Sequence, residues 1–191
     1  MKSPTLTARL LPLLLLVAAP FALTQERGTI RFGGLINDYS PANPNIKGSP
    51  YEMHGQWIMD LHDWGTADFL ADMTMSDYGT TNGALDATKG GQSAHTHHIR
   101  LTDAKIIPNM TGCPAYPTPV TTDGFQVSGT VSLITGNGSN APFETTPPTS
   151  KLQVCVTGGN EVPYSNITLV FAGPAATHFG TQAIHGVVRE P

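Results

Sequence analysis

Residues 53–75 read MHGQWIMDLHDWGTADFLADMTM, and most of the odd positions in this stretch carry apolar side chains. Alternation with a period of two is typical of a β-strand that buries one face. Two strands of the same parity bury a common face only if the connection between them has an odd number of residues. Residues 64–66, with glycine in the centre, provide such a connection. We therefore predict a β-hairpin whose register sets His62 opposite Asp68 on the polar face.

The same alternation continues along the chain, and glycine and proline residues, 20 and 16 in number, separate the alternating segments. Beyond the N-terminal segment there is no convincing helical period of ten residues. We therefore expect an all-β fold, a single antiparallel β-barrel or β-sandwich of six to eight strands, formed by residues 51–191. Residues 26–50 are rich in Gly, Pro and Asn and are interpreted as an extended arm or wrapping loop. The further strands are expected at residues 95–101, 125–133, 152–156, 167–171 and 177–188.

The first 25 residues, MKSPTLTARLLPLLLLVAAPFALTQ, have a basic start, an apolar centre and small residues near their end. This is the layout of a secretory signal peptide, and the apolar run is too short to span a bilayer. Residues 1–25 are therefore predicted to direct export, and the mature protein is expected to be secreted or periplasmic, with no membrane span. The net charge of −4 leaves no electrostatic basis for binding nucleic acid.

Cys113 and Cys155 are the two cysteines of the chain. An oxidising compartment favours a disulfide between them, and the bond would close a loop of about 42 residues. The alternative is a pair of buried free thiols. No C-x-x-C or Cys-His arrangement is present, so the cysteines give no sign of a catalytic role.

The sequence AHTHHIRL at residues 94–101 carries the sharpest chemical signal. On a strand, His95 and His97 share one face with two apolar residues, so both imidazoles are expected to point inward. Their ring nitrogens can converge on one ion, which would also offset the cost of burying two imidazoles without partners. The next residue, His98, is predicted to face solvent. The alternative is that the histidines lie at the mouth of a barrel and bind no ion.

A firm metal site needs a third ligand. His178 is the preferred candidate because it lies beside the apolar Phe179 and the flexible Gly180. His185 is seven residues further along, so on a regular strand it would face the side opposite to His178. His54, at the start of the first strong strand, is the other candidate. Three histidine ligands with an open position suit Cu, Zn or Fe rather than Ca or Mg.

Four methionines share the inward parity of the apolar face. Thioethers are good ligands for Cu(I), but the inward spacing favours a role in filling the core. We therefore interpret these residues first as core residues. They are Met53, Met59, Met73 and Met75.

Two short motifs resemble those of known β families. GGQSAHTH at residues 90–97 is similar to the first cupin motif, but the glutamate that follows in cupins, and a later P-x-G with a histidine, are missing. GQW at residues 55–57 resembles the G-x-W of lipocalins, in which the tryptophan closes one end of an eight-stranded barrel. Each resemblance covers one motif, and the sequence assigns the chain to neither family.

These observations support three alternative functions. The first is an exported β-domain that binds a transition-metal ion through His95, His97 and His178. In an extended form of this hypothesis, the protein is a metal-dependent enzyme that acts on a small substrate. The second is a non-enzymatic barrel that holds an apolar small molecule between four aromatic side chains. The third is a structural extracellular domain without a pocket. The four aromatic residues of the second hypothesis are Trp57, Phe69, Phe125 and Phe171.

Overall fold

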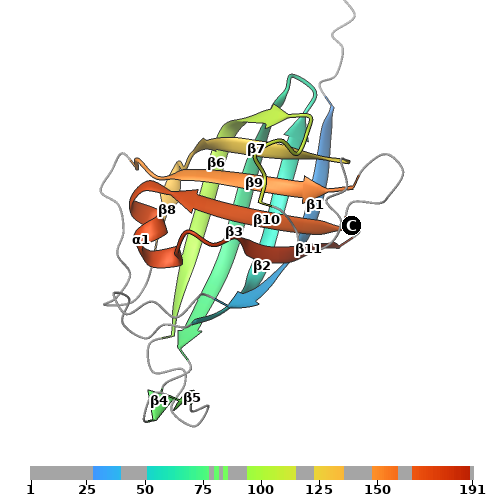
Figure 1. Ribbon diagram of the computed structural model, residues 1–191. Helices are drawn as coiled ribbons and strands as arrows, with labels where there is room; N and C mark the ends of the chain where they lie inside the picture. The colour runs from blue at the N-terminus through green and yellow to red at the C-terminus, as the bar shows by residue number, and fades with distance from the viewer. Residues whose placement is uncertain are drawn as a thin grey trace, which may run out of the picture.

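The computed structural model shows an antiparallel β-barrel closed by eight strands (Figure 1). The order around the barrel is β1, β2, β3, β6, β7, β9, β10 and β11, and β11 pairs again with β1. Closure pairs the edges of the sheet, so the barrel alternative of the predicted all-β fold is confirmed. The strands are β1 (Thr29–Tyr39), β2 (Tyr51–His62), β3 (Thr66–Asp77), β6 (His95–Ile107), β7 (Gly124–Thr130), β9 (Lys151–Thr157), β10 (Asn166–Ala172) and β11 (Ile184–Arg189). The structure describes residues 28–39, 51–77, 80–81, 84–85, 94–114, 123–135, 148–158 and 165–189.

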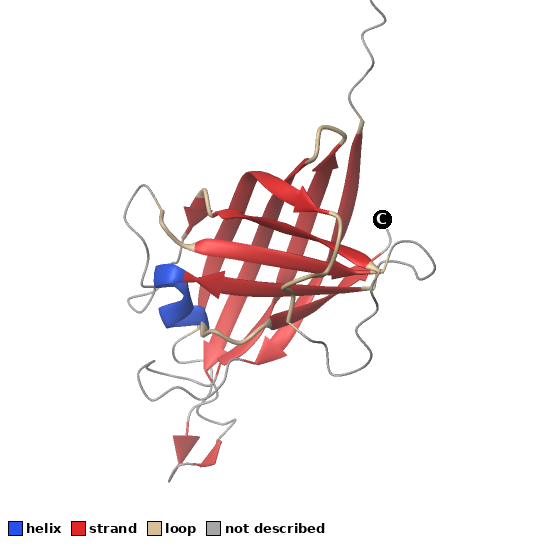
Figure 2. Ribbon diagram, turned by 45° about the horizontal axis from the view of Figure 1, so that its top comes forward, coloured by secondary structure: helices blue, strands red, loops and turns tan. Residues whose placement is uncertain are grey.

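Among the described residues, five short elements accompany the barrel. Strand β8 (Leu133–Ile134) pairs with β6, and β4 (Thr80–Thr81) pairs with β5 (Ala84–Leu85). The 3₁₀ turn η2 (Gly173–Ala175) continues into the one-turn helix α1 (Ala176–Phe179), which Figure 2 shows against one side of the strands. Among the described residues, no helix is long and apolar enough to cross a membrane.

The core fills the inside of the barrel in rows of directly paired side chains. The odd positions of β2 and β3 point inward, as the alternation predicts, and so do the odd positions of β6 up to Leu101. A bulge at the second half of β6 then shifts the inward parity, and Ala104 becomes buried. The inward rows across β2, β3 and β6 are Met53–Met75–His95, Gly55–Met73–His97, Trp57–Ala71–Ile99 and Met59–Phe69–Leu101.

The hairpin of β2 and β3 forms, but its predicted register is wrong by two residues. Leu61 pairs with Ala67, and His62 is a diagonal neighbour of Asp68, with Nε2 3.4 Å from the carboxylate. The connection is 63–65, in which Gly65 adopts a φ of 88° at the last position. A three-residue hairpin loop places its left-handed residue there, and not in the centre. A shift of two residues keeps the parity, so the predicted inward face is unchanged.

The expectation of an arm outside the domain is wrong for residues 29–39, which form β1 between β2 and β11. The reason for the loop-like composition is visible at Gly34. The indole of Trp57 reaches over this residue and donates a hydrogen bond from Nε1 to the Val187 carbonyl at 3.3 Å. A Cβ at Gly34 would collide with both Trp57 and the Val187 carbonyl oxygen. Residues 26–27 and 40–50 of the predicted arm, like the predicted signal peptide, lie outside the described residues.

The predicted disulfide between Cys113 and Cys155 is confirmed. Cys155 lies on β9 with its side chain away from the barrel interior, and the segment that holds Cys113 covers it there. Gln126 fastens the same segment, because its Nε2 donates to the carbonyl oxygens of Asn109 and Thr111 at 3.2 and 2.7 Å. The disulfide and these hydrogen bonds join residues 109–113 to the outer face of β7 and β9.

Candidate metal centre

Strand β6 directs His95 and His97 into the barrel, as predicted. Their side chains are 3% and 0% exposed. His98, between them and the rest of the strand, points to the outer face, where its Nδ1 lies 2.5 Å from a carboxylate oxygen of Asp72. Strand β6 therefore carries two buried imidazoles on its inward face, and the residue directly after the second one carries an exposed imidazole on the outward face.

His178 reaches the same place from α1, not from a strand. The prediction of one strand over residues 177–188 is wrong in its first part, because Pro174 begins the turn that leads into α1. Ser150 holds this turn by accepting a 2.7 Å hydrogen bond from the Ala175 N–H. Phe179 stacks on Phe171 of β10, with ring centroids 4.4 Å apart. These contacts fix α1 against the barrel and direct His178 toward its interior.

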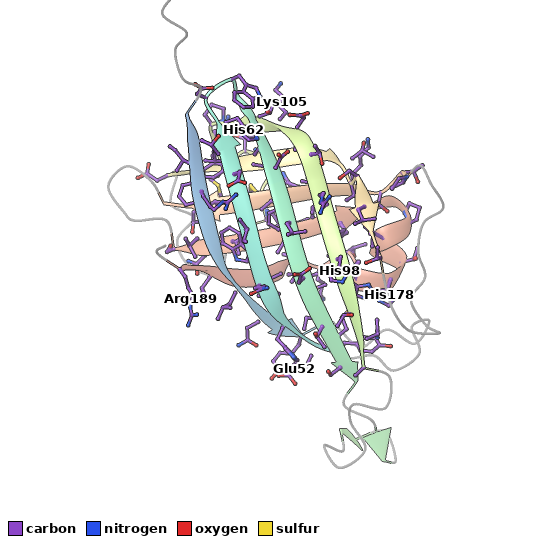
Figure 3. The ribbon with its side chains drawn as sticks, turned by 180° about the vertical axis from the view of Figure 1, so that it is seen from behind. Glu52, His62, His98, Lys105, His178 and Arg189 are labelled. Carbon is purple, nitrogen blue, oxygen red and sulfur yellow. A yellow bond between two sulfur atoms is a disulfide. The ribbon has the colours of Figure 1, made fainter. Side chains whose placement is uncertain are left out.

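The three predicted histidines come together in a compact cluster. His178 Nε2 lies 3.1 Å from His95 Nε2 and 3.2 Å from His97 Nε2. One ligand atom from each residue lies within 4.8 Å of the others. In Figure 3 the labelled His178 lies beside β6 near His98, toward the end of the barrel opposite His62 and Lys105. Residues 83 positions apart in the chain are thus brought within contact of one another.

Thr135, directly after β8, fixes the ring of His97. Its backbone is held beside β6, because the Thr135 N–H donates to the His98 carbonyl at 3.0 Å. The Thr135 carbonyl lies 2.8 Å from His97 Nδ1. A carbonyl only accepts hydrogen bonds, so Nδ1 carries the proton and Nε2 presents its lone pair to the cluster. A ring nitrogen held by a backbone carbonyl is the usual support of a metal-binding histidine.

Burial keeps two of the imidazoles neutral. It lowers the pKa of His97 to about 4; the hydrogen bond to the Thr135 carbonyl opposes this decrease, and the nearby His95 and His98 add to it. It also lowers the pKa of His178 to about 3, and the nearby His97 and His95 act in the same direction. Neutral imidazole is the form that binds metal ions.

A central cation fits this cluster better than hydrogen bonds alone. His97 Nε2 is an acceptor, so His178 Nε2 must be the donor in their contact, and the same proton would then also have to serve the contact with His95. Three nitrogens at 2.0–2.1 Å from a tetrahedral ion lie about 3.3 Å apart. The two observed separations of 3.1 and 3.2 Å are close to that value. The three histidines could therefore bind a metal ion.

The other two candidate ligands lie away from the cluster. His185 is on β11, and its Nδ1 lies 2.7 Å from Asp38, whose carboxylate also accepts from the His185 backbone N–H at 2.8 Å. His54 on β2 is exposed. His62 stacks on Trp64 with a centroid separation of 4.3 Å, in addition to its contact with Asp68.

The four aromatic residues of the apolar-ligand hypothesis are all buried, but the structure places them in different neighbourhoods. Trp57 stacks on Phe69 at 6.2 Å, Phe171 stacks on Phe179, and Phe125 packs against Phe32 at 6.3 Å. An outer hollow of about 350 Å³ includes Phe69 and none of the other three. A site formed by all four stays a prediction.

Of three residues that surround the cluster, the sequence points to Phe179 as the neighbour of His178 and does not point to Thr135 or Tyr51. Thr135 contacts His97 with its backbone carbonyl, which every residue type has. Its identity in the sequence therefore could not reveal this contact. The ring of Tyr51 lies 5.6 Å from that of His95, and the ring of Phe179 lies 5.0 Å from that of His97. Tyr51 could have been found, because it continues the inward odd positions of β2 by one step.

No protein-family model matches the chain, and neither the curated proteins nor the solved structures give a significant match.

Proposed function

We propose that this protein is an exported β-barrel that binds one transition-metal ion, Cu, Zn or Fe, through the Nε2 atoms of His95, His97 and His178. The observation that carries the proposal is the convergence of three buried imidazoles in which His97 already has its Nδ1 held by the Thr135 carbonyl. This combination supports a metal-binding tautomer before any ion arrives. The disulfide and the N-terminal sequence support export.

The surroundings favour holding the ion over activating water with it. All three histidines are at most 4% exposed, and the rings of Tyr51 and Phe179 pack against them. A catalytic centre keeps an open position for water or substrate. We therefore place the function in binding the ion, and do not extend it to a reaction on a small substrate.

The test is a metal titration of untagged, chelator-treated protein, with His97→Gln and His98→Gln as a matched pair. The wild type is expected to bind about one equivalent of metal. His97→Gln should lower the affinity by about a hundredfold, whereas His98→Gln removes an imidazole from the adjacent outward position and should leave the affinity unchanged. At a free metal concentration of 1,000 times Kd, the free energy of unfolding of the wild type should rise by about 4 kcal/mol.

His178→Gln serves as the second variant, because His178 lies on α1 and takes no part in the strand pairing of the barrel. It should weaken metal binding as His97→Gln does, with an unchanged β-sheet circular dichroism spectrum. Folded wild-type protein that takes up none of Cu, Zn and Fe would refute the proposal. Equal affinities in the wild type and both inward variants would refute it as well.

A further inference from the structure

The methionines of β3 lie directly opposite the histidines of β6. Met73 pairs with His97 and Met75 pairs with His95 in the antiparallel register. Met73 is 2% exposed and Met75 is 0% exposed, so both side chains point into the barrel with the imidazoles. Inward side chains in direct register have Cβ atoms about 4.5–5.5 Å apart. Two thioether side chains therefore flank the histidine pair.

Two aromatic rings also contact the cluster. Tyr51 packs its ring against His95 and His178, at 5.6 and 6.3 Å, and Phe179 packs its ring against His97 and His178, at 5.0 and 5.1 Å. Neither of these two side chains carries a carboxylate or a thiolate that could serve as a metal ligand. The register thus offers sulfur from β3 as the donor that joins the three nitrogens.

The charge of the cluster distinguishes between metals. Among the described residues, the group of ligand atoms contains three imidazoles and no carboxylate. An imidazole binds a metal ion in its neutral form, so the three histidines bring no negative charge to the site. The cost of moving an ion out of water grows with the square of its charge, so a buried site of neutral ligands accepts a monovalent ion at a lower cost than a divalent one. Cu(I) is monovalent and prefers soft thioether and imidazole ligands.

We propose that the Met73–Met75 pair supplies a thioether as the fourth ligand of the site, and that the site thereby selects Cu(I) over Zn(II). The proposal rests on the proposed function, since it names the metal and the additional ligand of the same cluster. It gives the buried methionines of β3 a role beyond filling the core.

The experiment compares two methionine variants of the full mature protein. Met73→Leu/Met75→Leu removes both thioethers beside the histidines and keeps the side-chain volume close to the original. Met59→Leu is the matched control, because Met59 is also inward and fully buried but pairs with Phe69, two inward rows beyond Met73. Cu(I) affinity is measured without oxygen by competition with bicinchoninate, and Zn(II) affinity by competition with a chromophoric chelator.

The double variant is expected to lose about tenfold or more in Cu(I) affinity while its Zn(II) affinity changes little. Met59→Leu should resemble the wild type for both ions. The X-ray absorption spectrum of the wild-type protein loaded with Cu(I) should contain a sulfur shell that the double variant lacks. This spectrum needs only the wild type to reveal sulfur, so it decides the question even if the double variant folds poorly.

Two results separate this inference from the proposed function. Binding of Cu(I) that depends on His97, with only nitrogen in the first shell and no effect of the double variant, would overturn the thioether ligand and leave the histidine site standing. Tighter binding of Zn(II) than of Cu(I) would overturn the selectivity. Absence of binding of either ion to the folded wild type, together with no uptake of iron, would overturn both proposals.

Discussion

The histidines inside the barrel and those on its outer surface differ in what their rings face. His95, His97 and His178 face one another, whereas His62, His98 and His185 each contact an aspartate. The negative charge of a carboxylate can balance the positive charge of an imidazolium, so the outer pairs need no additional ion. The inner cluster has three imidazoles and, among the described residues, no carboxylate within it. The same residue type thus contacts aspartates on the outer surface and forms, inside the barrel, a cluster that could bind a metal ion.

The difference also affects protonation inside the barrel. Each outer ring lies beside a carboxylate. Inside, burial holds the pKa of His97 and His178 well below the ordinary value. A metal ion can replace the missing proton there, because it bonds to the lone pairs that the neutral rings present.

The largest expected effect is the loss of stability of the metal-free protein in acid. The unfolded chain protonates both histidines near pH 6.5, while folded His97 and His178 stay neutral down to about 4 and about 3. Between pH 6.5 and 4 the unfolded state therefore binds more protons, and the free energy of unfolding falls as the pH falls. Each histidine contributes about 1.4 kcal/mol per pH unit, so the two together give a total decrease on the order of 7 kcal/mol over these roughly 2.5 pH units. Urea unfolding of chelator-treated protein across this range measures the decrease.

The control for this experiment is His178→Gln, which removes one of the two titrating groups. Its stability should depend less steeply on pH between 6.5 and 4. A wild-type stability that stays level over this range would show that the folded inner histidines protonate near the ordinary value, and the contrast between the two regions would be lost.

The next effect concerns the disulfide on the outer face of the barrel. Replacing both Cys113 and Cys155 by Ala frees a loop with a sequence separation of 42 residues. The free energy of unfolding should fall by about 3–4 kcal/mol, as the chain-entropy relation gives for a loop of this length. Metal affinity should not change, because the bond lies outside the barrel and the cluster lies inside. A parallel loss of metal affinity in the folded variant would show that the outer covering segment supports the inner site.

The smallest effect is expected at the outer pair of His98 and Asp72. Their side chains are 59% and 40% exposed, so water and salt screen the contact between them. Asp72→Asn should lower the free energy of unfolding by no more than about 1 kcal/mol, and the difference should shrink at high salt. Urea unfolding at low and high sodium chloride gives both values. A decrease in the free energy of unfolding several times larger than this would show that the outer pair contributes as much to stability as the buried cluster does, and would contradict the contrast.

The inward direction of His95 and His97 could be predicted from the sequence because strand alternation is a local property. Once β6 is a strand and Leu101 is buried, parity sends both imidazoles inward and His98 outward. Glycine-rich β1 could not be predicted in this way. Its inward position at Gly34 carries no side chain, since the indole of Trp57 on the neighbouring strand fills that space. Because a side chain of the neighbouring strand fills the inward space at Gly34, the sequence of β1 shows no clear alternation of apolar side chains.

The sequence predicts His178 as the third member of the cluster from its neighbours Phe179 and Gly180, and places it on a strand. The residue is in the cluster, but it lies in a one-turn helix that is too short to show a helical period. Its position depends on Ser150, which holds the preceding turn, and on the stacking of Phe179 on Phe171. These partners come from distant parts of the chain, so no local pattern reveals them.

The sequence by itself determined the all-β class, the inward faces of the strong strands, the pairing of the two cysteines and the inward His95 and His97. All of these follow from alternation over a few residues or from an even cysteine count. Only the tertiary structure decided that the sheet closes into a barrel, that β1 belongs to it, and that His178 and the Thr135 carbonyl meet the β6 histidines. Closure and convergence depend on contacts between segments far apart in the chain, and the free energy of those contacts is not encoded in any single segment.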